Sequence, residues 1–296
     1  MVNNSSDENM NQTREILKQV KKLEITTRQL ADGLITGNSD SIFKGQGIEF
    51  SEIRDYRPGD DIRAIDWKVT ARFNHPYIKE FIEERDLQIY FAIDLSESGS
   101  FGTNVSKKQK SFEIIASLMF AALRNNDRMG VFLITDKIEQ FIPARKGRKH
   151  LLQALSLIVS FTPNSLKTDL KNSLVQISKI IKRKSVLFVI SDFIDESEFL
   201  KPLKILRKKH DIIALKIADQ REEEIPDIGL IELEDKETGE QILVDTSDDD
   251  FRNSYSKLIS ENEVQFISNL RKIKIDTITL FTDQNYSVPL QKFFRR

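Results

Sequence analysis

The chain has 296 residues, with 45 Lys and Arg against 46 Asp and Glu and a formal net charge of −1. This balance argues against a general nucleic-acid binder, which carries a basic excess. The absence of cysteine excludes disulfides, thiolate metal sites and cysteine nucleophiles. The N-terminus is polar and acidic, unlike a secretory signal, and the longest mostly apolar run, residues 112–123, is too short for the about 20 residues of a transmembrane helix. We therefore expect a cytoplasmic protein without a transmembrane segment.

The N-terminal third of the chain differs in composition from the rest. Residues 1–12 are polar and are expected to form a disordered tail. Residues 13–34 carry apolar side chains at helical spacing. Residues 49–86 are dense in charges and aromatic rings but contain few aliphatic side chains. We therefore expect residues 13–86 to form a helix and a segment that packs on the main domain, with no core of its own.

Residues 87–296 are expected to form one α/β domain, because short apolar runs alternate with amphipathic stretches. Strands are predicted at 87–95, 128–135, 185–190, 211–217 and 275–281, helices at 106–125, 149–161, 169–181, 196–209, 248–270 and 288–294, and a β-hairpin at 230–244. Nearly continuous apolar strands are typical of a parallel sheet covered on both faces. The pattern predicts a doubly wound, mostly parallel sheet with a hairpin insertion.

Oxygen-bearing side chains follow the predicted strands. Asp94, Ser96 and Ser98 lie at the end of the first strand, Thr168 precedes a predicted helix, and Asp192 follows the third strand. Ligands of open parallel sheets bind at the carboxyl ends of strands. Carboxylates and hydroxyls are hard donors that suit one Mg²⁺ or Mn²⁺ ion. Because hydroxyls dominate the set, the ion would remain able to bind a carboxylate of a protein partner.

Other interpretations of these residues stay open. The hydroxyls would also serve as helix caps, and Asp192 as a turn residue. A metal-dependent hydrolase using Asp94 and Asp192 is the alternative function, and a metal-free structural scaffold is a third. No P-loop or G-x-S-x-G motif occurs.

A basic segment is a second candidate for partner binding. It contains Arg145, Lys146, Arg148 and Lys149. A solvated start of a helix is the simpler interpretation of such a charge run.

The motif Asp94-x-Ser96-x-Ser98, followed by Thr168 and Asp192, resembles the metal-ion-dependent adhesion site of von Willebrand factor type A domains. The resemblance implies that the hydroxyls ligate the ion directly and that the carboxylates act largely through water.

A longer resemblance covers the chain from about residue 33 to its end. The block GIEFSEIRDYRPGDDIRAIDWKVTARFNHPYIKEFIEERD and the segments ARKGRKHLL, KKHDIIALKIAD, ELEDKETGE and DTSDDDFRNSY are similar to the bacterial domain of unknown function 58 family. Many members carry transmembrane helices before this block, and this chain resembles the short soluble subgroup. The resemblance implies a von Willebrand A-like, non-enzymatic adaptor for a MoxR-type AAA+ ATPase in protein maturation or complex assembly, in the cytoplasm or peripheral to the inner membrane through partners.

Overall fold

The computed structural model describes residues 49–73, 75–82, 87–100, 106–195, 197–234 and 241–294, together with Lys18 and Lys21. The predicted tail at 1–12 and nearly all of the predicted helix at 13–34 lie outside the described residues. The chain divides into two compact units, one of which is Phe43–Leu87 and the other Met1–Ile42 with Gln88–Arg296. The expected packing of the first unit on the second stays a prediction.

The smaller unit contains an antiparallel pair, β1 (Glu49–Asp55) with β2 (Tyr77–Ile82), the 3₁₀ helix η1 (Ile62–Ala64) and α2 (Trp67–Phe73). Its acidic side chains build turns and caps. Asp60 accepts hydrogen bonds from Arg54 and from the Arg57 backbone, and Asp61 and Asp66 accept from the first turns of η1 and α2. Among its described apolar side chains, Ile78 is buried, whereas Ile62, Trp67 and Phe73 are exposed, with Trp67 at 67%.

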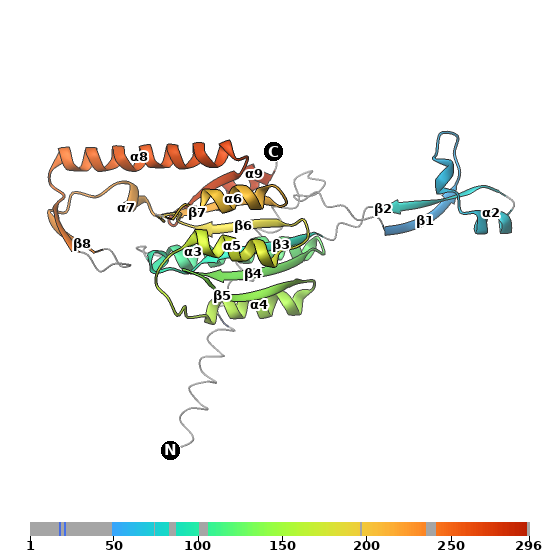
Figure 1. Ribbon diagram of the computed structural model, residues 1–296, viewed down its shortest axis with the longest axis horizontal. Coiled ribbons are helices and arrows are strands. Elements are labelled where there is room, and N and C mark those ends of the chain that lie inside the picture. Colours follow the sequence, from blue (N-terminus) through green and yellow to red (C-terminus); the bar gives the residue numbers. More distant parts are fainter. Residues whose placement is uncertain are drawn as a thin grey trace, which may run out of the picture. The chain divides into compact units, whose positions relative to one another are not determined.

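The larger unit contains a six-stranded sheet and flanking helices (Figure 1). The strands are β3 (Gln88–Asp94), β4 (Arg128–Ile134), β5 (Ile138–Arg145), β6 (Val186–Ser191), β7 (Asp211–Ala218) and β10 (Asp276–Phe281), and β8 (Leu230–Glu234) pairs with β9 (Gln241–Asp245) in a separate hairpin. The helices are η2 (Glu97–Ser100), α3 (Lys107–Arg124), α4 (Arg148–Ser160), α5 (Leu170–Ile180), α6 (Leu200–Arg207), α7 (Gln220–Glu223), α8 (Asp249–Lys272) and α9 (Ser287–Phe294).

The sheet has the strand order β10-β7-β6-β3-β4-β5, in which all neighbours are parallel except the antiparallel edge strand β5. The predicted doubly wound, mostly parallel α/β fold is thus confirmed. The antiparallel strand β5 was not predicted. Its side chains are all partly or fully exposed, so it lacks the continuous apolar run that identified the buried strands.

The two faces of the sheet are covered by different helices. Alternate residues of β3, Tyr90 and Ala92, share one core with Leu174 of α5 and Leu203 of α6, and α5 and α6 lie over that face (Figure 1). The intervening residues, including Phe91, are fully buried and point to the opposite face. Since both faces are covered, polar side chains of the buried strands are confined to the ends of the sheet. In the described residues, no helix is both long and apolar enough to cross a membrane.

Candidate functional site

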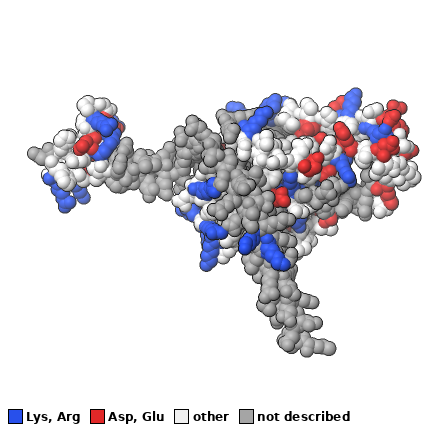
Figure 2. Space-filling model, turned by 180° about the vertical axis from the view of Figure 1, so that it is seen from behind, with Lys and Arg blue, Asp and Glu red and all other residues white. Residues whose placement is uncertain are grey.

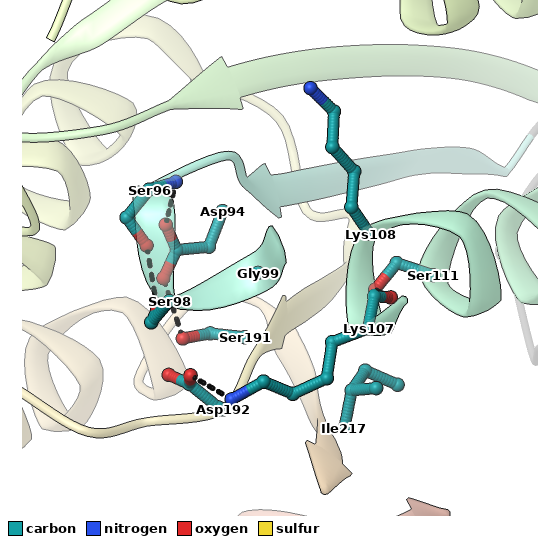
Figure 3. Close-up of a pocket in the computed structure, with 10 residues that line it drawn as sticks. All are labelled: Asp94, Ser96, Ser98, Gly99, Lys107, Lys108, Ser111, Ser191, Asp192 and Ile217. Carbon is teal, nitrogen blue, oxygen red and sulfur yellow. Dashed lines mark hydrogen bonds and ion pairs between the residues drawn. The ribbon is translucent and has the colours of Figure 1, made fainter. Parts of the chain in front are cut away.

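A pocket opens at the carboxyl ends of β3 and β6, the two strands at the centre of the sheet (Figure 3). The chain continues from β3 to β4 on one side, whereas β6 pairs with β3 on the other. This reversal of strand order is a topological switch point, where open α/β sheets bind their ligands. The pocket is lined by Asp94, Ser96, Ser98, Gly99, Lys107, Lys108, Ser111, Ser191, Asp192 and Ile217.

Asp94 is the last residue of β3, and its carboxylate is held on both oxygens. The Ser96 backbone N–H donates to Oδ1 at 3.0 Å and the Ser191 hydroxyl donates to Oδ2 at 2.7 Å. Burial, reinforced by the charge of Asp192, raises the pKa of Asp94 to about 6. The site therefore contains a positioned carboxylate that is costly to ionise without a nearby cation.

Ser96 and Ser98 lie in the tight turn after β3, where the Gly99 backbone N–H donates to the Ser96 carbonyl. Their hydroxyl oxygens are 3.1 Å apart (Figure 3). Two adjacent ligands of an octahedral Mg²⁺, each at roughly 2.1 Å, are separated by about 3 Å. The hydroxyl pair therefore fits neighbouring positions around such an ion, with Asp94 beside it.

The second carboxylate of the pocket is bound by a lysine that sequence analysis did not identify. Lys107 Nζ, at the start of α3, lies 2.7 Å from Asp192 Oδ2 and 2.7 Å from Glu222 Oε1 of α7. Burial by itself would lower the pKa of Lys107, but the charges of Asp192 and Glu222 outweigh burial and raise it. The lysine is thus a permanent cation beside the predicted metal ligands, and it joins the ends of β6 and β7.

The structure brings four of the five predicted ligands together in the pocket: Asp94, Ser96, Ser98 and Asp192. Thr168 is not among the lining residues. It belongs to the loop before α5, which approaches the same turn because the Glu97 backbone N–H donates to the Leu166 carbonyl at 3.1 Å. Its role as a ligand stays a prediction.

The alternative roles as caps and turns are only partly realised. The N-cap of α3 is Ser106 and that of α5 is Asp169, so Ser96, Ser98 and Thr168 are not the capping residues of these helices. Asp192 does support a turn, since its Oδ1 accepts from the Ile194 backbone N–H at 3.2 Å.

The basic segment lies at the opposite end of the sheet. Arg145 ends the antiparallel strand β5 and pairs with Met129 near the start of β4. Lys146 follows β5, and Arg148 and Lys149 are the first two residues of α4. If this segment binds a partner, it does so at a different end of the sheet from the pocket.

Three further residues contact the predicted ligands or each other at the site, although the sequence pattern assigned them no role: Lys107, Glu222 and Ser191. Lys107 occurs in the run KKQK at a helix start, where charged residues are usually solvated. Glu222 follows β7, and the crossover from β6 to β7 brings it next to Lys107. Ser191 directly precedes Asp192 at the end of a predicted strand, and this position was the one feature of the sequence that could have indicated its place in the site.

The sheet order, the antiparallel edge strand and the serine-rich turn at the switch point define a von Willebrand factor A-like α/β domain. Among solved structures, it is similar to an aerotolerance-related membrane protein from Bacteroides fragilis, with a TM-score of 0.50 and 15% identity over 70% of this chain and 96% of that one. At this identity the likeness concerns the fold alone.

The chain belongs to the family described as "Protein of unknown function DUF58", which matches residues 52–265. It is 28% identical to the uncharacterised protein Rv1480 of Mycobacterium tuberculosis over 279 residues, covering 93% of this chain and 87% of that protein. It is also 28% identical to the uncharacterised protein YeaD of Bacillus subtilis over 137 residues, covering 45% of this chain and 32% of YeaD.

Proposed function

We propose that this protein is a non-enzymatic adaptor that holds one Mg²⁺ or Mn²⁺ ion at the switch point and binds a carboxylate of a protein partner there. The observation that carries the proposal is the hydroxyl pair of Ser96 and Ser98, 3.1 Å apart beside Asp94 in an open pocket. The hydroxyls of Ser96, Ser98 and Thr168 would ligate the ion directly. The carboxylates of Asp94 and Asp192 would act largely through water.

The charges around the pocket favour an anionic partner over catalysis. The positive charge of Lys107 is shared by the carboxylates of Asp192 and Glu222, so the protein itself neutralises part of the negative charge near an ion. An ion with mostly neutral ligands keeps its affinity for an anion. Hydrolytic metal sites instead use carboxylates to hold the metal and a water nucleophile, and both oxygens of Asp94 already accept hydrogen bonds.

The partner class in this proposal comes from the family resemblance. It is a MoxR-type AAA+ ATPase or the client of such a machine, acting in protein maturation or complex assembly. We place the protein in the cytoplasm, at the inner membrane only through its partners.

Titration calorimetry with a MoxR-type ATPase from the same organism tests the proposal. Each titration is made without nucleotide, once in Mg²⁺ and once in EDTA, so that the ATPase's own nucleotide–metal complex does not contribute. We expect binding in Mg²⁺ that EDTA abolishes. Ser96→Ala should weaken it by roughly thirtyfold, which corresponds to about 2 kcal/mol for a central contact.

The matched control is Ser178→Ala, which removes a partly exposed serine hydroxyl from α5 that donates to the Val175 carbonyl of the same helix. This variant should bind like the wild type. Binding that ignores EDTA and Ser96→Ala would contradict the metal bridge and favour the scaffold. Mn²⁺-dependent turnover of a phosphoester, lost in Asp94→Asn, would favour the hydrolase.

A further inference from the structure

The hairpin β8–β9 is a two-stranded sheet of its own. In the described part of the chain, its strands pair with each other and with no third strand. A two-stranded hairpin is only marginally stable in water. In the residues that the structure describes, the outer edges of β8 and β9 pair with no further strand, and free strand edges are templates for another strand.

Aliphatic side chains are exposed on both faces of this hairpin. Antiparallel pairing places Leu230 and Leu243 on one face and Ile242 on the other. These side chains are 64%, 67% and 60% exposed, and Ile228, just before the hairpin, is 64% exposed. Single exposed aliphatic residues are ordinary, but a group of them on one small element marks an interaction surface.

The hairpin also lies in the most acidic part of the chain. Residues 219–250 contain 14 Asp and Glu but only two Lys and Arg, a net charge of −12. Because the whole chain carries −1, all other residues together carry +11. Acidic side chains accordingly gather at the end of the larger unit that contains α7, the hairpin and the start of α8 (Figure 2). Nucleic acids and anionic lipid surfaces are repelled by such a region, whereas a basic segment is attracted.

We propose that the hairpin β8–β9 binds an extended, basic and aliphatic segment of a partner protein, which adds to it as a third strand. Backbone hydrogen bonds would form along the free edge. Aliphatic side chains of the partner would cover Leu230 and Leu243, or Ile242 on the other face. Its Lys or Arg side chains would face acidic neighbours such as Glu232, which is exposed.

This surface is separate from the metal ligands, although it begins at the same rim of the sheet. The hairpin follows α7, whose Glu222 contacts Lys107 at the pocket. The inference does not depend on the metal, and its test is made in EDTA.

Fluorescence anisotropy with synthetic peptides tests the inference. The probe is a labelled peptide of alternating Lys and Val. One control peptide alternates Glu and Val, and the other is the Lys and Val peptide with alternate backbone nitrogens methylated, which blocks strand pairing. We expect the probe to bind and both controls to bind at least about tenfold more weakly. Raising the salt from roughly 0.05 M to roughly 0.5 M should weaken binding through screening.

Protein variants localise the binding. Ile242→Ser/Leu243→Ser should weaken binding of the probe at least about tenfold, and Glu232→Lys should weaken it without removing an aliphatic group. The matched control is Ile205→Ser on α6, where the side chain is 62% exposed, and this variant should bind like the wild type. The inference is overturned if the probe does not bind, if both hairpin variants bind it normally, or if the methylated peptide binds equally well. Self-association through the hairpin, detected by sedimentation without probe binding, would assign the surface to a second copy and overturn it too.

Discussion

Lys107 Nζ lies 2.7 Å from Asp192 Oδ2, and the two side chains are only 3% and 5% exposed. Residues 85 positions apart thus form a buried ion pair at the end of the sheet that carries the predicted metal ligands. The lysine holds Asp192 in place when no metal is bound. It also limits the negative charge that the pocket offers to a metal, which is why we expect an anionic ligand to complete the site.

Replacing Lys107 by Met should destabilise the protein strongly. Removing one partner of a buried pair leaves an uncompensated buried charge and costs about 3–5 kcal/mol. Urea unfolding measures the loss. Lys108→Met, which changes the neighbouring lysine of the same pocket, is the control and should change stability by less than about 1 kcal/mol. The double variant Lys107→Met/Asp192→Asn should recover part of the loss. An unchanged stability of Lys107→Met would show that the ion pair contributes nothing.

Ionisation of Asp94 should lower the stability of the metal-free protein as the pH rises from about 4 to about 6. Folding raises the pKa of Asp94 from its ordinary value of 3.8 to about 6. Between these values the folded state binds more protons than the unfolded state, so the free energy of unfolding falls with increasing pH. Asp94→Asn, which cannot ionise, should lose this slope and be more stable than the wild type above pH 6. Melting temperatures in EDTA across this range check the prediction, and parallel pH profiles would refute it.

Gly130 in β4 should not tolerate a side chain. An added Cβ would lie 2.6 Å from Tyr90 Cε1 and 2.8 Å from the Ile142 carbonyl oxygen. Because the backbone oxygen of β5 cannot move freely, Gly130→Ala should cost about 1–3 kcal/mol of stability. The control is Gly99→Ala, whose Cβ would meet nothing closer than Lys108 Cβ at 3.8 Å. Equal melting temperatures for the two variants would contradict this packing.

The buried part of the fold could be predicted because its strands are continuous apolar runs. Residues such as Phe91 and Phe188 lie in strands covered on both faces, and their neighbours in sequence are apolar too. The edge strand β5 escaped prediction, since its side chains alternate irregularly between partial and full exposure. The strands and helices of the smaller unit were not predicted either. Turns and caps organised by Asp60, Asp61 and Asp66 shape this unit, and they leave little apolar periodicity to detect.

The candidate site could be predicted where a ligand directly follows a strand. Asp94 and Asp192 stand at strand ends, and the pocket contains both. Lys107 and Glu222 come from helix starts that only the tertiary crossovers bring together. Long-range pairing of this kind leaves no mark on the spacing of the sequence. The loop of Thr168 has no strand to position it, which is why spacing alone did not locate that side chain.

The proposed role of the protein requires that the hydroxyl pair of Ser96 and Ser98 binds a divalent ion. Titration calorimetry with Mg²⁺ and with Mn²⁺ at pH 7 measures this in the isolated protein, with Ser96→Ala/Ser98→Ala as the test variant and Ser178→Ala as the control. We predict that one ion binds to the wild type and to the control, and at least about tenfold more weakly to the double variant, whose melting temperature stays close to that of the wild type. Equal affinity of the double variant, or no binding by the wild type at millimolar ion, would contradict the metal site.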